Sequence, residues 1–346
     1  MSRRGTKSIN LALQGGGAHG AFTWGVLDRL LEEDRLEIEG ISGTSAGAMN
    51  AAMLKTGYLA GGRDGAKTQL EKFWRKIQST AARNINPVAD WVSLFSSDAG
   101  KIAETIFASP VYQAQEALGR VLSPYDWNPL NINPLRDVLE ELIDFKACSR
   151  ECEPHLFISA TNVKSGKIKV FRGEDLSIDV ILASACLPNL YQAVEINEEF
   201  YWDGGYMGNP ALYPLFYHTK GSDVVIVHVN PIERDDVPRT ASAIQNRINE
   251  ISFNSSLLRE LRVVGFVKKL IEEGRVKPGE MKNVLIHSVR DDATMAELNV
   301  ATKLAPEPDL FDHLRARGSA AADDFLTAHW DKIGRESSVV LPDLLE

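Results

Sequence analysis

The sequence predicts an α/β protein whose mostly parallel central sheet is covered by helices on both faces. Short strand-like apolar runs alternate with helical patterns along the chain, which is typical of α/β folds. Two of the runs, at residues 224–229 and 284–286, are apolar at nearly every position. Strands of this kind suit the interior of a parallel sheet, because both of their faces are buried.

Hydrophobic periodicity places the individual elements. Strands are expected at residues 8–13, 36–41, 156–163, 167–171, 199–202, 224–230 and 284–289, and helices at 18–33, 46–56 and 240–274. The helix at 18–33 is amphipathic, with its charges opposite an apolar stripe. In the helix at 240–274 the apolar positions also have helical spacing, and we expect them to pack against the rest of the protein: Ile244, Ile248, Ile251 and Leu258.

Composition and charge narrow the function. The 346 residues carry a formal net charge of −9, which disfavours binding to nucleic acid and general attraction to anionic lipid. Membrane contact would therefore have to be apolar or local. No apolar run approaches the roughly 18 residues of a membrane span, and the run after the N-terminus is too short for a signal-peptide core. Cys148, Cys152 and Cys186 form no CxxC pair; as reduced thiols they predict a cytoplasmic location.

The first chemical motif is Gly43-Thr44-Ser45-Ala46-Gly47, which fits G-x-S-x-G. It falls between an expected strand and an expected helix, where a sharp turn pushes the serine out of the sheet. The flanking glycines remove side chains that would crowd the serine, and the following helix points N–H groups toward developing negative charge. This context favours Ser45 as a nucleophile over a structural turn.

A second motif, Gly15-Gly16-Gly17-Ala18-His19-Gly20, lies between the first strand and its helix and has two interpretations. As G-x-G-x-x-G, with Glu37 or Glu39 about 20 residues later, it fits a dinucleotide-binding unit. Against this, the second strand does not end at the acidic residue but runs on into the serine motif. Alternatively, the glycines let backbone N–H groups form an oxyanion hole, the partner that acyl transfer requires.

A base for the serine has one main candidate, Asp203 in Tyr201-Trp202-Asp203-Gly204-Gly205. By itself this pattern favours a hairpin turn, because most Asp-Gly pairs belong to turns.

Taken together, the glycine loop at 15–20, the elbow at 43–47 and the triplet at 203–205 resemble, in order and spacing, the three motifs of the patatin-like phospholipase family. The small-residue segment 183–188 and Asn209-Pro210 add to a similarity that covers about residues 9–210. The resemblance implies a three-layer α/β/α hydrolase that cleaves carboxylic esters of lipids with a Ser-Asp dyad, without histidine, metal or cofactor.

Carried across residue by residue, the resemblance makes Ser45 the nucleophile and Asp203 the base. Gly15, Gly16 and Gly17 then belong to the oxyanion loop, and Gly43 and Gly47 to the elbow. His19 stands where the family often has Arg or Lys, so no side-chain role is carried over to that position. The expected partner is a lipid or other ester substrate, with transient membrane-surface contact left open.

The domain prediction follows the same resemblance. Residues 7–230 are expected to form the patatin-like catalytic domain, and residues 231–346 a mostly helical extension packed on it. Within the first part, only 8 of the 57 residues at 79–135 are charged and six are aromatic. This insertion is either a lid over an apolar pocket or an ordinary helical segment, since aromatic residues mostly serve cores.

Two rival functions stay open. A Ser45-Asp203-His228 triad would follow the chain order of the α/β-hydrolases, although His228 and His287 fall in expected strands and are interpreted as core histidines. A non-catalytic nucleotide-binding or regulatory α/β protein would use the glycine loop without the chemistry. Metal-dependent hydrolysis has no sequence support, because the chain has no HExxH motif, EF-hand spacing or His/Cys cluster.

Overall fold

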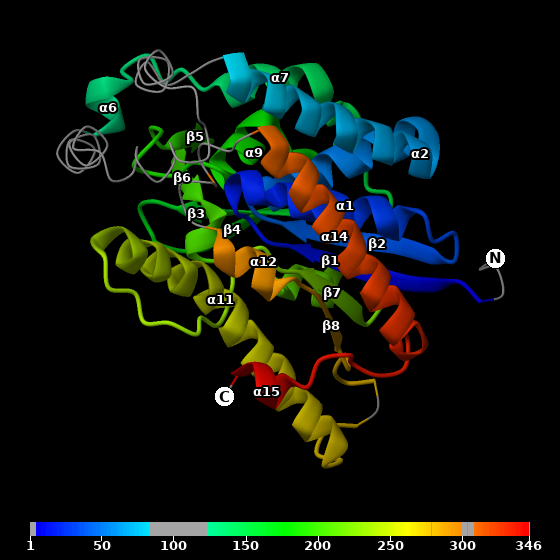
Figure 1. Cartoon of the computed structure of the whole chain (residues 1–346). Helices are drawn as coiled ribbons and strands as arrows, with labels where there is room; N and C mark the ends of the chain where they lie inside the picture. Colours follow the sequence, from blue (N-terminus) through cyan, green and yellow to red (C-terminus); the bar gives the residue numbers. More distant parts are fainter. Residues whose placement is uncertain (1–4, 84–122, 278, 299–302, 304–307, 346) are drawn as a thin grey trace.

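The computed structural model describes residues 5–83, 123–277, 279–298, 303 and 308–345. Its centre is an eight-stranded sheet in the order β5-β6-β3-β2-β1-β7-β8, with β4 paired to β3 (Figure 1). The strands are β1 (Lys7–Leu13), β2 (Leu36–Gly43), β3 (His155–Asn162), β4 (Ile168–Phe171), β5 (Val194–Ile196), β6 (Glu199–Asp203), β7 (Asp223–Val227) and β8 (Leu285–Val289).

The sheet is mostly parallel, as the apolar strands predict. Strands β3, β2, β1, β7 and β8 run parallel to one another, so their carboxyl ends share one edge. Strands β4, β5 and β6 are antiparallel to their neighbours and extend the sheet on the β3 side. Ligands in sheets of this type bind outside the carboxyl ends of the parallel strands.

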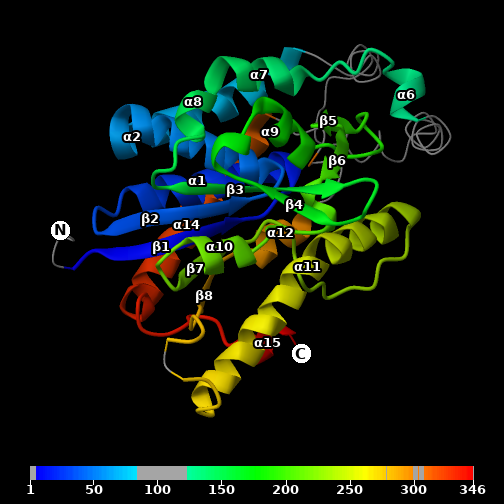
Figure 2. The ribbon, with the colours of Figure 1, turned by 180° about the vertical axis from the view of Figure 1, so that it is seen from behind.

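Helices cover both faces of the sheet, which confirms the three-layer α/β/α architecture (Figures 1 and 2). On one face lie α1 (Gly20–Leu31), α2 (Ala46–Arg83), α7 (Pro134–Leu142), α8 (Phe145–Cys148), α9 (Ile178–Ser184) and α14 (Pro308–His329); on the other lie α10 (Tyr213–His218), α11 (Ala241–Glu272) and α15 (Leu341–Leu345). Two short helices, α6 (Pro124–Trp127) and α12 (Asp292–Glu297), lie toward the carboxyl edge.

Alternation along the strands builds a separate core on each face. In β1, Ile9, Leu11 and Leu13 join the core under α1, α2 and α14, whereas Ala12 joins the core under α10, α11 and α15. Helix α14, which the sequence patterns did not predict, packs along α1. Because the C-terminal third supplies both β8 and α14, it contacts both the sheet and a covering layer; the division at residue 230 itself stays a prediction.

The helix expected at 240–274 forms as α11, but the prediction about its packing is wrong for three of the four apolar residues, since only Leu258 is half-buried. Ile244, Ile248 and Ile251 are 44%, 52% and 55% exposed. The side that faces the protein instead carries Leu257, Leu261 and two buried polar residues, Glu250 and Asn254. Helical spacing identified the element but not its buried face, because this helix also has an inward polar face.

The sequence also predicted an apolar insertion and no membrane span. Most of the apolar insertion at 79–135, including residues 84–122 with Trp91 and Phe95, lies outside the described residues. No helix in the described part of the chain is long and apolar enough to cross a membrane.

Candidate active site

Ser45 lies in a two-residue turn between β2 and α2, at the carboxyl edge of the sheet. Its φ of 53° is left-handed, a conformation that non-glycine residues rarely adopt and that is often found at functional sites. A Cβ on Gly47 would lie 2.2 Å from the Leu13 carbonyl oxygen, and one on Gly43 would lie 2.7 Å from the Gly47 carbonyl oxygen. The turn is therefore tight enough to require glycine on both sides of the serine.

Hydrogen bonds fix this turn to neighbouring segments. The Ser45 N–H donates to Ser184 Oγ at 2.9 Å, at the end of α9. The Thr44 hydroxyl donates to the Gly208 carbonyl oxygen at 2.6 Å, in the segment that follows Asp203. The elbow and the Asp203 region are thus held together by direct bonds.

Asp203 ends β6 and pairs with Ala160 of β3, the strand next to β2. It begins a short 3-10 turn, η3 (Gly204–Tyr206), rather than a hairpin, so the interpretation as a hairpin turn is wrong. The residue is 2% exposed. Its Oδ1 accepts the Gly205 N–H at 2.7 Å, and its backbone N–H donates to the Cys186 carbonyl oxygen at 2.8 Å.

Burial dominates the acid-base behaviour of Asp203. Loss of hydration raises the pKa of its carboxyl from 3.8 to about 7, because a charged carboxylate is disfavoured in a dry site. The Gly205 N–H and then the Ser45 hydroxyl oppose this rise, since both stabilise the charged form. A carboxyl beside the Ser45 hydroxyl with a pKa near neutrality is suited to accept its proton.

The glycine loop lies directly against the elbow. A Cβ on Gly15 would be 2.8 Å from Ser45 Cβ, and Gly17 has a left-handed φ of 57°. The Gly15 N–H is already bonded to Asn209 Oδ1 at 2.6 Å. By contrast, the N–H groups of Gly16 and Gly17 donate to no acceptor among the described residues. Of the three glycines expected in an oxyanion hole, these two have N–H groups available.

A buried cluster of four amide side chains, Gln14, Asn209, Asn230 and Asn254, holds this loop, and the sequence analysis did not find it as a unit. Asn230 Nδ2 donates to the Gly15 carbonyl oxygen at 2.8 Å, opposite the Asn209 bond to its N–H. Gln14 Nε2 donates to Asn254 Oδ1 at 3.0 Å, and Gln14 Oε1 accepts the Asn230 N–H at 3.1 Å. Gly15 is therefore fixed from both sides.

Two basic side chains lie at the edge of this cluster. Lys303 Nζ donates to Asn230 Oδ1 at 2.7 Å, and burial lowers the pKa of this amine to about 8. Burial and the nearby Lys303 charge hold the pKa of His19 well below its ordinary value of 6.5. His19 is consequently uncharged at neutral pH.

In the described part of the chain, neither rival histidine forms a side-chain hydrogen bond with Ser45 or Asp203. His228 follows β7, which ends at Val227 rather than at residue 230; burial lowers its pKa to about 3. Its ring nitrogens have no hydrogen-bond partner in the described part of the chain. His287 is bonded through Nε2 to Asp223 Oδ1 at 3.0 Å, at the amino end of β7. Neither histidine is placed as the base of a triad.

The dinucleotide interpretation also lacks its acidic residue. Glu37 and Glu39 lie in the first half of β2, away from its carboxyl end, where a ribose ligand would be needed. The Glu39 carboxylate is buried and accepts backbone N–H groups from Lys220 and from Gly221, the latter at 2.7 Å.

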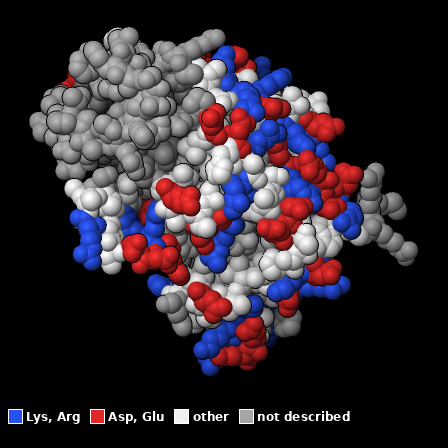
Figure 3. All heavy atoms as spheres, in the orientation of Figure 1, with Lys and Arg blue, Asp and Glu red and all other residues white. Residues whose placement is uncertain are grey.

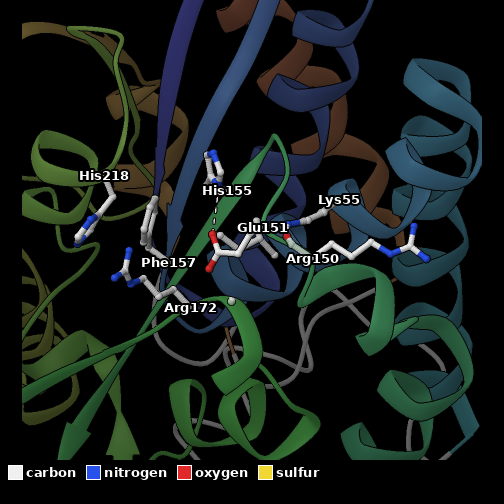
Figure 4. Close-up of a pocket in the computed structure, with 9 residues that line it drawn as sticks. Lys55, Arg150, Glu151, His155, Phe157, Arg172 and His218 are labelled. Carbon is white, nitrogen blue, oxygen red and sulfur yellow. Dashed lines mark hydrogen bonds and ion pairs between the residues drawn. The ribbon is translucent and has the colours of Figure 1, made fainter.

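Two cavities lie beside the sheet. One, of about 340 Å³, is lined by Cys186, Tyr191, Leu182 and Phe200 among others, and adjoins Asp203 through the Cys186 carbonyl bond. The other, of about 90 Å³, lies at the start of β3 (Figure 4). Basic residues surround it, the carboxylate of Glu151 lies in its midst and Arg150 points away. Because it lies at the amino end of β3, and Ser45 follows the carboxyl end of the parallel strand β2, this cavity is separate from the serine site.

Comparison with known proteins finds two distant structural likenesses. No curated protein matches the chain. The crystal structure of VipD from Legionella pneumophila is 16% identical, with a TM-score of 0.42, and the match covers 95% of this chain and 68% of that one. The structure of the ExoU-SpcU complex from the type III secretion system of Pseudomonas aeruginosa is 17% identical, with a TM-score of 0.32. That match covers 99% of this chain and 74% of the other. Neither likeness is close enough to carry a conclusion.

A family model gives a firmer result. The model described as patatin-like phospholipase matches residues 11–216, which is more than half of the chain and includes the glycine loop, the elbow and Asp203. Membership supports hydrolysis of lipid esters as the activity. The chain belongs to the patatin-like phospholipase family.

Proposed function

We propose that this chain is a serine acyl hydrolase that cleaves carboxylic ester bonds of lipids, in the manner of a phospholipase A or lysophospholipase. Ser45 is the nucleophile and Asp203 the base of a dyad. The observation that carries the proposal is the pairing of a left-handed serine turn with a buried carboxyl whose pKa is raised to about 7.

The mechanism assigns one role to each group. Asp203 takes the proton of the Ser45 hydroxyl while Oγ attacks the ester carbonyl carbon. The N–H groups of Gly16 and Gly17 hold the resulting oxyanion, where a single donor is worth about 3–4 kcal/mol. Collapse of the tetrahedral intermediate breaks the ester bond, and the leaving alcohol takes the proton from Asp203. Water, activated by Asp203, then releases the acid and restores Ser45.

The cavity beside Asp203 supports a substrate larger than an acetate ester. Its 340 Å³ falls within the size of small-molecule sites, roughly 300–1,000 Å³. Leu182, Tyr191 and Phe200 give it an apolar wall, and the rest of the lining is largely polar: Asn131, Asn133, Arg136, Asp179, Gln192 and Glu195. Phospholipids, lysophospholipids, galactolipids, neutral glycerides and polyesters all remain candidate substrates.

A fluorophosphonate probe tests the proposal, because it labels only an activated serine. Wild type should be labelled and should hydrolyse p-nitrophenyl butyrate, whereas Ser45→Ala should do neither. Ser165→Ala, at an exposed turn, is the matched control and should behave as wild type. Labelling that persists in Ser45→Ala would refute the assignment, and an unlabelled, inactive wild type would favour a non-catalytic protein.

A further inference from the structure

The outward face of α11 is unusual for a helix on a protein surface. Its exposed residues are Ala241, Ile244, Gln245, Ile248, Ile251, Arg259, Arg262, Val263, Phe266, Lys269 and Glu272. Five of these are large apolar residues, each between 44% and 62% exposed. Exposed apolar residues gathered on one element indicate a contact surface more often than single scattered ones do.

The charged residues of α11 are also unevenly distributed, with two of its acidic residues bonded to the rest of the protein. Glu250 is 4% exposed and forms ion pairs with Arg234 and Arg247. The carboxylate of Glu260 accepts the N–H groups of Leu212 and Tyr213 at 3.0 and 2.8 Å. Both acidic groups are therefore engaged by the protein.

Arg259 and Arg262 lie on the outside, whereas Arg247 is paired with Glu250 and Lys269 with Glu273. Arg259 forms no ion pair among the described residues, and Arg262 bonds only to the Leu345 carbonyl oxygen at 3.5 Å. The outward face is apolar at its N-terminal half and apolar and basic at its C-terminal half, with its one carboxylate at the last residue, Glu272.

The inward face of the same helix reaches the candidate active site. A Cβ on Gly205 would lie 1.9 Å from the Phe253 ring, so this ring packs on the turn that follows Asp203. Asn254 is bonded to Gln14 in the amide cluster, and Ser256 Oγ accepts the Asn209 N–H at 3.3 Å. A surface that contacts the outside of α11 is thus one helix diameter from the groups that position the glycine loop.

We infer that the outward face of α11 is a lipid-docking surface, with Ile244, Ile248 and Ile251 inserted among the lipids and Arg259 and Arg262 beside anionic headgroups. Helices with exposed apolar and basic residues bind in the headgroup region of bilayers. The choice of a lipid surface rests on the proposed function, since the ester substrate would be in that surface.

The charge of the whole chain requires the contact to be local. The net charge is −9, and the face in Figure 3 mixes acidic and basic residues without a large area of one sign. The loop before α11 also carries Glu233, Asp235 and Asp236. Attachment at the isoleucine end therefore depends on apolar insertion, and the two arginines add attraction at the other end.

Flotation with vesicles of phosphatidylcholine and phosphatidylglycerol tests the inference. The proteins carry Ser45→Ala so that the bilayer stays intact, which makes binding independent of hydrolysis. Replacing Ile244, Ile248 and Ile251 by glutamine, a good helix former, should lower partitioning at least about tenfold. Tyr217→Gln, at a 77% exposed residue of α10, is the matched control and should bind normally. Arg259→Gln should weaken binding chiefly at low salt.

With Ser45 restored, the triple variant should hydrolyse p-nitrophenyl butyrate normally but lose activity on the vesicles. Failure of the Ser45→Ala parent to float, or unchanged flotation of the triple variant, would overturn the docking surface whatever the hydrolysis assays show. If the triple variant instead changed from dimer to monomer while its flotation was unaltered, the face would be an interface between copies and the inference would also fail. Normal docking by a protein without esterase activity would refute only the proposed function.

Discussion

Replacing the buried base should abolish catalysis and yet stabilise the fold. The pKa of Asp203 rises from 3.8 to about 7, a shift of about three units. At about 1.36 kcal/mol per unit, keeping this carboxylate charged in the folded state costs ~4 kcal/mol. The amide side chain of the Asp203→Asn variant would keep an oxygen for the Gly205 N–H but would have no charge to bury. We expect the variant to be inactive and more stable than wild type at neutral pH.

The sign of the effect gives it a characteristic pH dependence. Below about pH 4 the carboxyl is protonated in both the folded and the unfolded chain, so the penalty is absent there. It grows as pH rises from about 4 to 7 and is complete above the folded pKa. The gain in unfolding free energy for Asp203→Asn should be about 2 kcal/mol at pH 5 and ~4 kcal/mol at pH 8.

Urea unfolding of both proteins at pH 5 and pH 8 measures this difference. Asp175→Asn, at an exposed aspartate, is the control and should leave the unfolding free energy nearly unchanged at either pH. If the gain in unfolding free energy over wild type were the same at both pH values, Asp203 would not be a desolvated carboxylate. A variant less stable than wild type at pH 8 would lead to the same conclusion. The pKa argument for the dyad would then fail as well.

Three further predictions address the rest of the site. The kcat/KM of wild type should rise with pH to a plateau with its midpoint near 7, because only ionised Asp203 accepts a proton; a midpoint near 4 would contradict this. Asn209→Ala should lower kcat at least about tenfold, because Asn209 holds the Gly15 N–H. Asn254→Ala, in the same cluster but not bonded to Gly15, should lower mainly the stability. Equal losses of kcat in the two variants would exclude a positioning role for Asn209. His228→Ala should keep most esterase activity, and a loss of about a thousandfold would restore the triad.

Local patterns were sufficient to predict the frame of the fold. Alternating apolar runs predicted a mostly parallel sheet, and the strand expected at 36–41 followed by Gly43-Thr44-Ser45 placed the serine on a strand-to-helix turn. These features depend on residues that are neighbours in the sequence. For Asp203 the residues alone favoured a hairpin turn, and only its resemblance to a family motif pointed to the serine.

Contacts between distant segments were not predictable in this way. The bond between Gly15 and Asn209 joins residues 194 positions apart, and nothing in the local sequence shows that it removes one N–H from the oxyanion loop. The buried face of α11 was missed for a related reason: Glu250 and Asn254 face inward because they meet Arg234 and Gln14, so hydrophobic spacing pointed to the wrong side.

These long-range contacts connect the C-terminal third to the candidate active site. A left-handed serine and a buried carboxylate are both unfavourable locally, so the surrounding structure has to hold them. Part of that structure comes from beyond residue 230: Asn254 bonds to Gln14, and Lys303 bonds to Asn230, which in turn fixes Gly15. Strand β8 extends the same sheet and α14 covers α1. We therefore expect residues 231–346 to stabilise the candidate site, even though the family motifs all lie before them.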